Sequence, residues 1–355
     1  MILLSLIFIL LIIILSSGFR TYLKNFPGYS DSMKISIITT AKNEALLIQK
    51  FISLIAKLDY PQENFEFILV DDNSSDDTYT IAKTLIEKNE NFKIIKAEEK
   101  LLPAKRGALL KGIQSSQFPY IVITDADCTP SANWLKVCAA QFERGHDFIF
   151  GAAPFYQDNN FINKLSCIEN IKNQFLSFSL ASLGAPYTAS ARNLGFLKEA
   201  FYRIGGYNNT IETMSGDDDL LLREAIKNKL RISAFYSNDS MVYSTTKMNL
   251  NDYLNQKARH TQSSIYYQIK NRVVLSAWHL LNLIMLFSPI FIFINFNLIW
   301  LFIVKMTADI IIITNVQKKF GYDFNAAEIF FYDILYEIFL LINFFNALLG
   351  KAKWK

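Results

Sequence analysis

Three groups of closely spaced acidic residues stand out as candidates for chemistry. Asp71 and Asp72 follow the apolar run Phe-Ile-Leu-Val, Asp125 and Asp127 follow Tyr-Ile-Val-Ile-Thr, and a third group covers residues 217–219. Carboxylates that converge on one site repel one another, and a cation would offset that repulsion. Such hard oxygen ligands favour Mg²⁺ or Mn²⁺. The acidic groups therefore predict a divalent-metal site.

Each acidic group also has a purely structural interpretation. Ser75 or Asp76 could cap the next helix, and Thr129-Pro130 has the pattern of an N-cap with proline at the first helical position. Residues 217–219 open a helical run, where acidic side chains favour the positive end of the helix dipole. For a single group, capping is as plausible as chemistry. Three groups in one chain favour a functional site.

The elements that must position these acids follow from an alternating pattern between residues 34 and 151. β-rich runs are expected at 35–40, 65–70, 92–95, 120–124 and 148–150, and helices at 44–58, 77–89, 104–115 and 131–143. This alternation predicts an α/β fold with a mainly parallel, buried sheet. Ligands bind at the carboxyl ends of such strands, which is where the first two acidic groups lie. No G-x-G-x-x-G or P-loop lysine motif follows a predicted strand, so a dinucleotide oxidoreductase or P-loop ATPase has little support.

Long apolar runs lie at both ends of the sequence. The chain is 51% hydrophobic and only 19% charged, which excludes a disordered chain. Residues 2–15 contain one polar residue, Ser5, and residues 273–304 contain no Lys, Arg, Asp or Glu. The second run is too long for one crossing of a bilayer core of about 30 Å, so two helices are expected there. A third run, 329–349, carries Asp333 and Glu337 and fits either a crossing or an interfacial helix.

Basic residues beside these runs indicate an orientation. Arg20 and Lys24 follow the first run and no basic residue precedes it, which favours a retained anchor over a cleaved signal peptide. The positive-inside rule then places residues from about 20 to 272 in the cytoplasm. We expect a multi-pass protein of the inner (cytoplasmic) membrane, in contact with membrane lipids. Its parts would be an anchor at 1–19, a cytoplasmic α/β domain at 33–272, and C-terminal transmembrane or interfacial helices at 273–350.

Cysteines, histidines and net charge exclude other kinds of site. Cys128, Cys138 and Cys167 show neither paired metal spacing nor an even-numbered disulfide framework, so free thiols in a reducing compartment are expected. The three histidines are far apart in the sequence, and no zinc site is expected. The net charge is only +4 and no basic run is present, so no nucleic-acid partner is expected.

Several motifs occur in an order that is typical of a known family. They are Thr40-Ala41-Lys42-Asn43-Glu44, Val70-Asp71-Asp72-Asn73-Ser74-Ser75-Asp76-Asp77-Thr78, Asp125-Ala126-Asp127, Gly216-Asp217-Asp218-Asp219-Leu220 with Arg223, and Gln256-Lys257-Ala258-Arg259-His260. With these motifs, the chain resembles the family 2 glycosyltransferases, which are inverting, membrane-associated enzymes of the GT-A fold. It is similar to the branch of polysaccharide synthases and N-glycosyltransferase-like enzymes. The resemblance covers roughly residues 34–275.

The resemblance implies a role for each matching residue. Asp217 would be the general base that deprotonates the acceptor hydroxyl, and Asp127 would hold Mg²⁺ or Mn²⁺ on the diphosphate. The donor nucleotide or its diphosphate would contact Thr40, Glu44, Asp71, Asp72, Lys105, Asp125 and Arg259. Gln256, His260 and Asp218 would lie in the region of the acceptor and diphosphate. The implied donor is UDP- or GDP-linked, and the implied acceptor is a lipid-linked or growing glycan of the cell envelope.

Two positions depart from the family pattern. Gly216 replaces the usual acid of E-D-x-D-L-x-x-R, and His260 replaces the tryptophan of Q-x-x-R-W. An imidazole offers a smaller face than an indole for stacking on a sugar, so processive synthesis is in doubt. His260 is equally compatible with a helix-surface residue, Lys105 with a solvated helix charge, and Gln256 and Arg259 with an exposed helix face.

Two other functions remain alternatives at this stage. A sugar nucleotidyltransferase also uses a Rossmann-like sheet with metal-binding acids, but the glycine- and lysine-rich phosphate loop expected of it is not present. A non-catalytic membrane scaffold could retain a nucleotide-sugar-binding fold, and the substitutions at Gly216 and His260 are compatible with it. The intact Asp217 argues against the scaffold.

Overall fold

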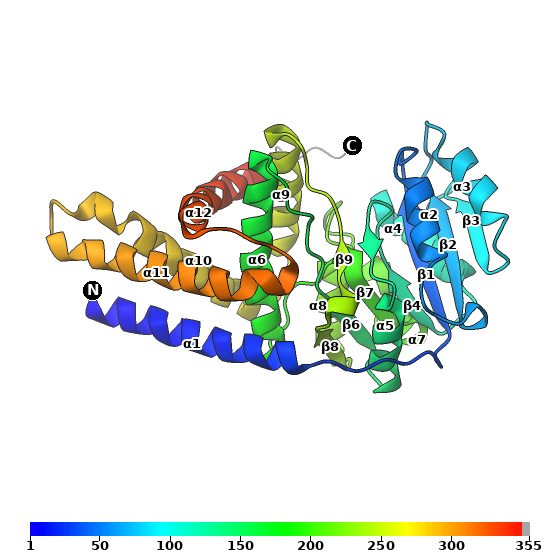
Figure 1. The fold of residues 1–355 in the computed structure, drawn as a ribbon, viewed down its shortest axis with the longest axis horizontal. Helices are drawn as coiled ribbons and strands as arrows, with labels where there is room; N and C mark the ends of the chain where they lie inside the picture. Colours follow the sequence, from blue (N-terminus) through cyan, green and yellow to red (C-terminus); the bar gives the residue numbers. More distant parts are fainter. Residues whose placement is uncertain (350–355) are drawn as a thin grey trace. The chain divides into compact units, whose positions relative to one another are not determined.

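The computed structural model describes residues 1–349 of the chain, which form two compact units (Figure 1). An α/β unit contains residues 23–153 and 188–245. A helical unit contains residues 1–22, 154–187 and 246–349. The helical unit therefore takes its second segment from within the predicted 33–272 domain.

The α/β unit is built on a seven-stranded sheet with the strand order β3-β2-β1-β4-β7-β6-β8. The strands are β1 (Ile35–Ala41), β2 (Phe65–Asp71), β3 (Phe92–Lys96), β4 (Tyr120–Ile123), β6 (Phe148–Gly151), β7 (Leu194–Leu197) and β8 (Ile232–Phe235). Strands β1 to β4 pair in parallel, as do β6 and β8, whereas β7 is antiparallel to both of its neighbours. A small separate sheet pairs β5 (Thr129–Pro130) with β9 (Val242–Tyr243). The predicted mainly parallel sheet is confirmed.

The helices of this unit are α2 (Ile48–Ile55), α3 (Thr78–Ile86), α4 (Ala104–Ser115), α5 (Trp134–Glu143), α7 (Lys198–Arg203) and α8 (Asp219–Lys227). The α4 helix has the predicted bounds, whereas α2 begins four residues later than predicted. Asn43 is in the left-handed region with φ of 57°, and residues 45–47 form a turn before α2 starts. The polar loop at the end of β1 thus extends into the stretch predicted to be helical.

The α4 helix packs directly on the sheet because it carries glycine at the point of contact. A Cβ atom at Gly112 would lie 2.5 Å from Ile38 Cγ2 and 3.0 Å from Val70 Cγ2. Any larger residue would push α4 away from β1 and β2. This packing fixes the position of α4 on the sheet. The N-terminus of α4 carries Lys105, which contacts the acidic groups at the carboxyl ends of the strands.

The helical unit contains α1 (Ile2–Lys24, whose last two residues belong to the α/β unit), α6 (Phe161–Ser182), α9 (Leu250–Ser264), α10 (Ile269–Phe287), α11 (Ile299–Val316) and α12 (Ala326–Leu348). Three segments of the described chain are long and apolar enough to cross a membrane: 2–24, 269–291 and 296–320. The two helices predicted for the second apolar run are therefore present, in addition to the predicted N-terminal helix. The α12 segment is not among the three, and Gly350, the end of the predicted C-terminal segment, lies outside the described residues.

The apolar face of α6 is part of the interior of the helical unit. Leu165 and Ile168 are fully buried. The ring of Phe178 stacks on that of Tyr22 at a centroid distance of 4.1 Å. Helix α6 is thus a packed interior element of this unit.

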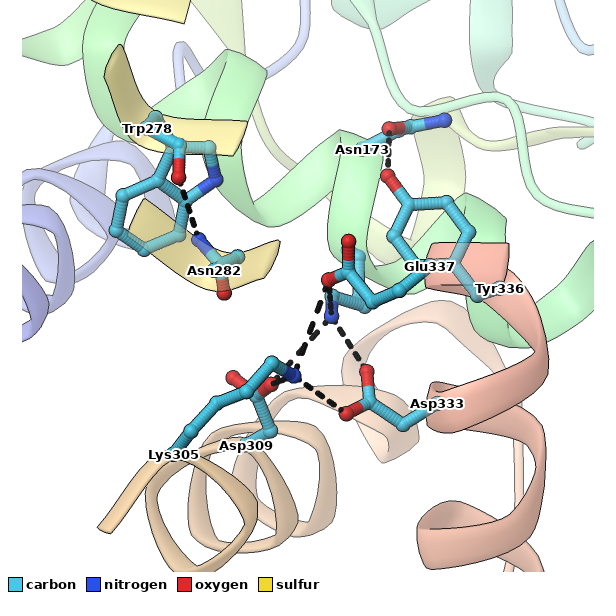
Figure 2. A network of polar contacts seen from close by, with 9 residues as sticks. Asn173, Trp278, Asn282, Lys305, Asp309, Asp333, Tyr336 and Glu337 are labelled. Atoms are coloured by element: carbon cyan, nitrogen blue, oxygen red, sulfur yellow. Dashed lines mark hydrogen bonds and ion pairs between the residues drawn. The ribbon is translucent and has the colours of Figure 1, made fainter. Parts of the chain in front are cut away.

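A cluster of buried charges joins three helices of this unit, as Figure 2 shows. Lys305 Nζ lies 2.6 Å from Asp309 Oδ2 on α11 and 2.9 Å from Asp333 Oδ2 on α12. Lys172 on α6 contacts Asp333 and lies 2.9 Å from Glu337 Oε1. Lys305 and Asp309 therefore neutralise each other within a larger network. The two α12 acids of this network, Asp333 and Glu337, are almost fully buried.

Candidate active site

The loops that follow β1 and β2 are tied together at the carboxyl edge of the sheet. Asn43 and Asn73 both adopt φ of 57°, a left-handed conformation that asparagine tolerates better than most residues. The backbone N–H of Asn43 donates to Ser74 Oγ at 3.0 Å, and that of Ser75 donates to Asn43 Oδ1 at 2.8 Å. The N–H of Glu44 donates to Thr78 Oγ1 at 2.7 Å. The first two predicted motifs therefore form one connected loop structure.

The two acids of the β2 loop have different surroundings. Asp71 ends β2 and is 3% exposed, and its Oδ1 has no hydrogen-bond partner among the described residues. Asp72 is also buried, and its Oδ1 accepts a hydrogen bond from Lys100 Nζ at 2.7 Å. Thr40 lies opposite Val70 in the sheet, one residue before this acidic pair. The structure therefore gathers Thr40, Asp71 and Asp72 at one edge, as a nucleotide pocket requires.

The second acidic group has the arrangement of a metal site. One ligand atom from each of Asp125, Asp127 and Cys128 lies within 4.8 Å of the others. Burial, together with the charges of Asp125 and Asp127, raises the pKa of the Cys128 thiol well above its usual range. Without a metal ion the thiol is therefore protonated at neutral pH. The two half-buried carboxylates supply hard oxygen ligands, which fit Mg²⁺ or Mn²⁺.

Lys105 connects the second acidic group to the third. Its ammonium group contacts the Asp125 carboxylate directly and lies 3.9 Å from Asp217 Oδ2. Burial opposes the charge on Lys105, but Asp125 and Asp217 outweigh this effect and raise its pKa above the usual value. Lys105 is therefore a permanent cation between the predicted metal acids and the predicted base.

The three consecutive acids of the third group play different parts. Asp218 caps α8, accepting from the N–H of Asp219 at 2.8 Å and from the N–H of Ala191 at 2.9 Å. Burial and the charges of Asp219 and Asp217 raise the pKa of Asp218 well above its usual range. Asp219 accepts from Thr188 Oγ1 at 2.5 Å. The capping interpretation thus holds for Asp218.

Asp217 differs from its two neighbours. Its Oδ2 is buried and has no hydrogen-bond partner among the described residues, and it faces Lys105. Gly216 adopts φ of 81°, a conformation that favours glycine, and its carbonyl accepts from the N–H of Leu220 at 3.0 Å at the start of α8. Asp217 therefore keeps a carboxylate oxygen outside the hydrogen bonds of the α8 cap, and its role as the base stays a prediction.

Arg106 is a site residue that sequence reasoning missed. Its guanidinium is 1% exposed and donates to Thr210 Oγ1 at 3.1 Å, to the Thr213 carbonyl at 2.6 Å and to the Ser215 carbonyl at 2.5 Å. These bonds fix the segment that leads into Asp217. The sequence signal was the pair of adjacent basic residues at the start of a predicted helix, directly after a proline.

The residues of the last motif lie on α9, in the helical unit. Tyr253 and one motif residue, Lys257, hold α9 to α6, because Tyr253 Oη and Lys257 Nζ each lie 2.9 Å from Glu169 Oε2. Gln256, Arg259 and His260 are distributed along the same helix. Their role at the diphosphate or acceptor stays a prediction.

Comparisons with known proteins relate the α/β unit to a family of enzymes. Residues 36–205 match the family described as Glycosyl transferase family 2. The probable glycosyltransferase YdaM of Bacillus subtilis is 34% identical over 138 residues, which are 36% of this chain and 33% of YdaM. The beta-monoglucosyldiacylglycerol synthase of Trichormus variabilis is 27% identical over 194 residues, which are 53% of this chain and 40% of that protein. The chain thus spans less than half the length of these curated relatives.

A solved structure supports the fold over the whole chain. The mannosyltransferase PcManGT of Pyrobaculum calidifontis, in complex with GDP-Man and Mn²⁺, aligns with a TM-score of 0.59. The alignment covers 98% of this chain and 99% of that chain at 16% sequence identity. The predicted GT-A fold is confirmed.

Proposed function

Because this chain carries a family 2 glycosyltransferase domain of GT-A fold, we propose that it transfers a sugar from a nucleotide-sugar donor to a lipid-linked or glycan acceptor. One observation carries the proposal. A single ammonium group, Lys105 Nζ, lies within 4 Å of both Asp125 and Asp217. The acid next to the donor diphosphate and the acid that would act as base are therefore close enough to serve one reaction centre.

The donor would bind at the carboxyl edge of the sheet. Asp72, with Thr40 and Glu44, would accept hydrogen bonds from the base or ribose. Asp125 and Asp127 would hold Mg²⁺ or Mn²⁺, which neutralises the charge that develops on the leaving nucleoside diphosphate. PcManGT was solved with GDP-Man and Mn²⁺ on the same fold, which makes a UDP- or GDP-linked donor and a divalent metal reasonable for this chain.

Asp217 would take the proton of the acceptor hydroxyl as that oxygen attacks the anomeric carbon. The carboxylate suits this role because its Oδ2 has no hydrogen-bond partner among the described residues. The bond from the anomeric carbon to the diphosphate oxygen breaks as the new glycosidic bond forms on the opposite face. A single displacement of this kind inverts the anomeric configuration.

The acceptor is proposed to carry a lipid. Three segments of this chain are able to cross a membrane, and one relative is named as a synthase of a glucosylated diacylglycerol. A lipid-anchored acceptor would be confined to the membrane surface on which the enzyme is anchored.

We place the α/β unit on the cytoplasmic face of the inner membrane. With spans at 2–24, 269–291 and 296–320, six basic residues lie on one side of the membrane: Arg20, Lys24, Lys270, Arg272, Lys318 and Lys319. This asymmetry satisfies the positive-inside rule without a fourth crossing.

Substituted cysteines test this orientation, since the three native cysteines are buried. In Glu90→Cys the thiol lies on the exposed surface of the α/β unit, and in Phe293→Cys it lies between the second and third spans. In intact cells, a membrane-impermeant maleimide is expected to label Phe293→Cys and to label Glu90→Cys only after permeabilisation. The reverse pattern would overturn the orientation.

The activity is tested with the purified, detergent-solubilised chain, a panel of UDP- and GDP-sugars and a native lipid extract. We expect release of nucleoside diphosphate without pyrophosphate from one donor, only when Mn²⁺ or Mg²⁺ is present. NMR of the product should show the anomeric configuration opposite to that of the donor. Release of pyrophosphate would indicate a nucleotidyltransferase, and a retained configuration would exclude the single displacement.

A further inference from the structure

We propose that Lys105 is a resident counter-ion of the acidic site, and that it makes binding of the divalent metal depend on a nucleoside diphosphate. This inference rests on the proposed function, because it takes Asp125 and Asp127 as the metal acids. It assigns to Lys105 a control over the order of binding, beyond the donor contact expected from the sequence.

The position of Lys105 is the first argument. Its ammonium contacts the Asp125 carboxylate, and Asp125 is one of the two carboxylates that would hold the metal. A metal ion bound by Asp125 must therefore share this carboxylate with the Lys105 ammonium or displace the ammonium from it. The Lys105 side chain is only 24% exposed, so water screens the repulsion between the ammonium and a metal ion poorly.

The charge balance is the second argument. Asp125, Asp127 and Asp217 contribute three negative charges, and Lys105 offsets one of them while no donor is bound. The Arg106 guanidinium also acts on Asp217, but its three hydrogen bonds to residues 210, 213 and 215 hold it in place. A divalent cation that binds without a nucleotide gains less electrostatic free energy, because the acidic site already holds the Lys105 ammonium. A nucleoside diphosphate brings additional negative charge, so the ammonium and the metal can then both be paired.

The chemistry of lysine makes such an exchange feasible. Its ammonium is a compact charge on a flexible stem, and lysine is a common phosphate ligand. Movement from the Asp125 carboxylate to a phosphate oxygen exchanges one charge-assisted hydrogen bond for another. The backbone of α4 can remain in place during this exchange, because Gly112 holds that helix against β1 and β2.

A second lysine, Lys100, is paired with the acid that would bind the nucleoside, so the proposed effect on metal binding belongs to Lys105 alone. Lys100 Nζ pairs with Asp72 Oδ1 at 2.7 Å and also donates to the Ala104 carbonyl at 3.1 Å. Lys100 therefore covers the acid that would bind the nucleoside, whereas Lys105 covers the acid that would bind the metal. Only removal of Lys105 should alter the affinity for the metal alone.

The test measures Mn²⁺ binding to the full-length protein by electron paramagnetic resonance, with and without UDP or GDP. The variants are Lys105→Met and, as the matched control, Lys111→Met, which makes the same change further along α4. For the wild type and the control, we expect weak Mn²⁺ binding that the nucleotide strengthens at least about tenfold. Lys105→Met should bind Mn²⁺ at least about tenfold more tightly without nucleotide, and should lose most of the enhancement.

Equal or weaker Mn²⁺ binding by Lys105→Met, compared with wild type in the absence of nucleotide, would overturn the proposal. Lys105→Arg retains the positive charge, and it controls for a folding defect caused by substitution at this position. It should keep the weak, nucleotide-dependent binding of the wild type, and tight binding by this variant would equally overturn the proposal. Failure of the proposed function is a separate result, since it would show as absent sugar transfer by wild-type protein while Mn²⁺ binding follows the pattern above.

Discussion

At the scale of single residues, neighbouring acids with the same sequence signature have different surroundings. Asp218 and Asp219 accept hydrogen bonds from backbone and side-chain groups near residues 188–191, whereas Asp217 faces Lys105. Asp71 is buried at a strand end, whereas Asp72 pairs with a lysine. A carboxylate whose hydrogen bonds hold a loop is less available for a substrate. The surroundings therefore favour Asp217 over Asp218 and Asp219 as the proposed proton acceptor.

Asp127→Ala is expected to weaken nucleotide binding only when metal is present. The substitution removes one of two oxygen ligands, so the gain in UDP or GDP affinity that Mn²⁺ provides should fall at least about tenfold, or about 1.4 kcal/mol. Isothermal titration in Mn²⁺ and in EDTA measures both values. Asp59→Ala, at an exposed carboxylate paired with Lys136, is the matched control. Unchanged affinity of Asp127→Ala in Mn²⁺ would remove this residue from the metal site.

At the scale of elements, the local sequence pattern was sufficient to predict some helices and strands and not others. The helix at 104–115 and the parallel strands β1 to β4 were predictable because their apolar periodicity is clear and local. Strands β7 and β8 lie outside the predicted set. They are four residues long, β7 contains Gly195, and both depend on pairing with β6, which is distant in sequence. The role of Arg106 was hidden for the same reason, since its acceptors lie about one hundred residues further along the chain.

Arg106→Met should loosen the segment that carries Asp217. The change removes a donor from the Thr210 hydroxyl and from the Thr213 and Ser215 carbonyls, of which the Ser215 carbonyl keeps the hydrogen bond from Thr213 Oγ1 at 2.6 Å. A buried acceptor left unpaired costs about 1–3 kcal/mol. We expect a lower Tm and faster hydrogen exchange over residues 210–219. Arg203→Met, at an exposed position on α7, is the control. Exchange at the wild-type rate in this segment would show that Arg106 does not hold it.

At the scale of the whole molecule, the chain alternates between two units. Residues 154–187 leave the α/β unit and contribute α6 to the helical unit, and the chain then returns at residue 188. The sequence predicted one uninterrupted domain, since the apolar face of α6 would fit the interior of either unit. A charge is stable in an apolar interior only when it is paired. Lys172 on α6 pairs with Asp333 on α12, which also pairs with Lys305 on α11, so these charges favour packing of α6 against α11 and α12.

Lys305→Met should destabilise the helical unit. It removes one of two cations from the cluster in Figure 2 and leaves three buried acids with Lys172 alone. Breaking a buried pair in this way costs about 3–5 kcal/mol. We expect a clear fall in the Tm of the detergent-solubilised protein, partly recovered when Asp309→Leu is added.

The control for this change is Lys318→Met, which removes an exposed cation near the end of the same apolar segment. It should leave the Tm close to that of the wild type. An equal Tm for Lys305→Met and wild type would mean that the cluster contributes little to the stability of the helical unit.

The most direct test of the account is the rate of sugar transfer by Asp217→Asn, measured together with its affinity for the donor. The amide keeps the shape of the side chain but cannot accept the proton of the acceptor. We predict a fall in turnover of about 10²–10⁴-fold with donor affinity and Tm unchanged, whereas Asp59→Asn retains full turnover. Turnover by Asp217→Asn near the wild-type rate would contradict the assignment of the base, and with it the mechanism proposed for this site.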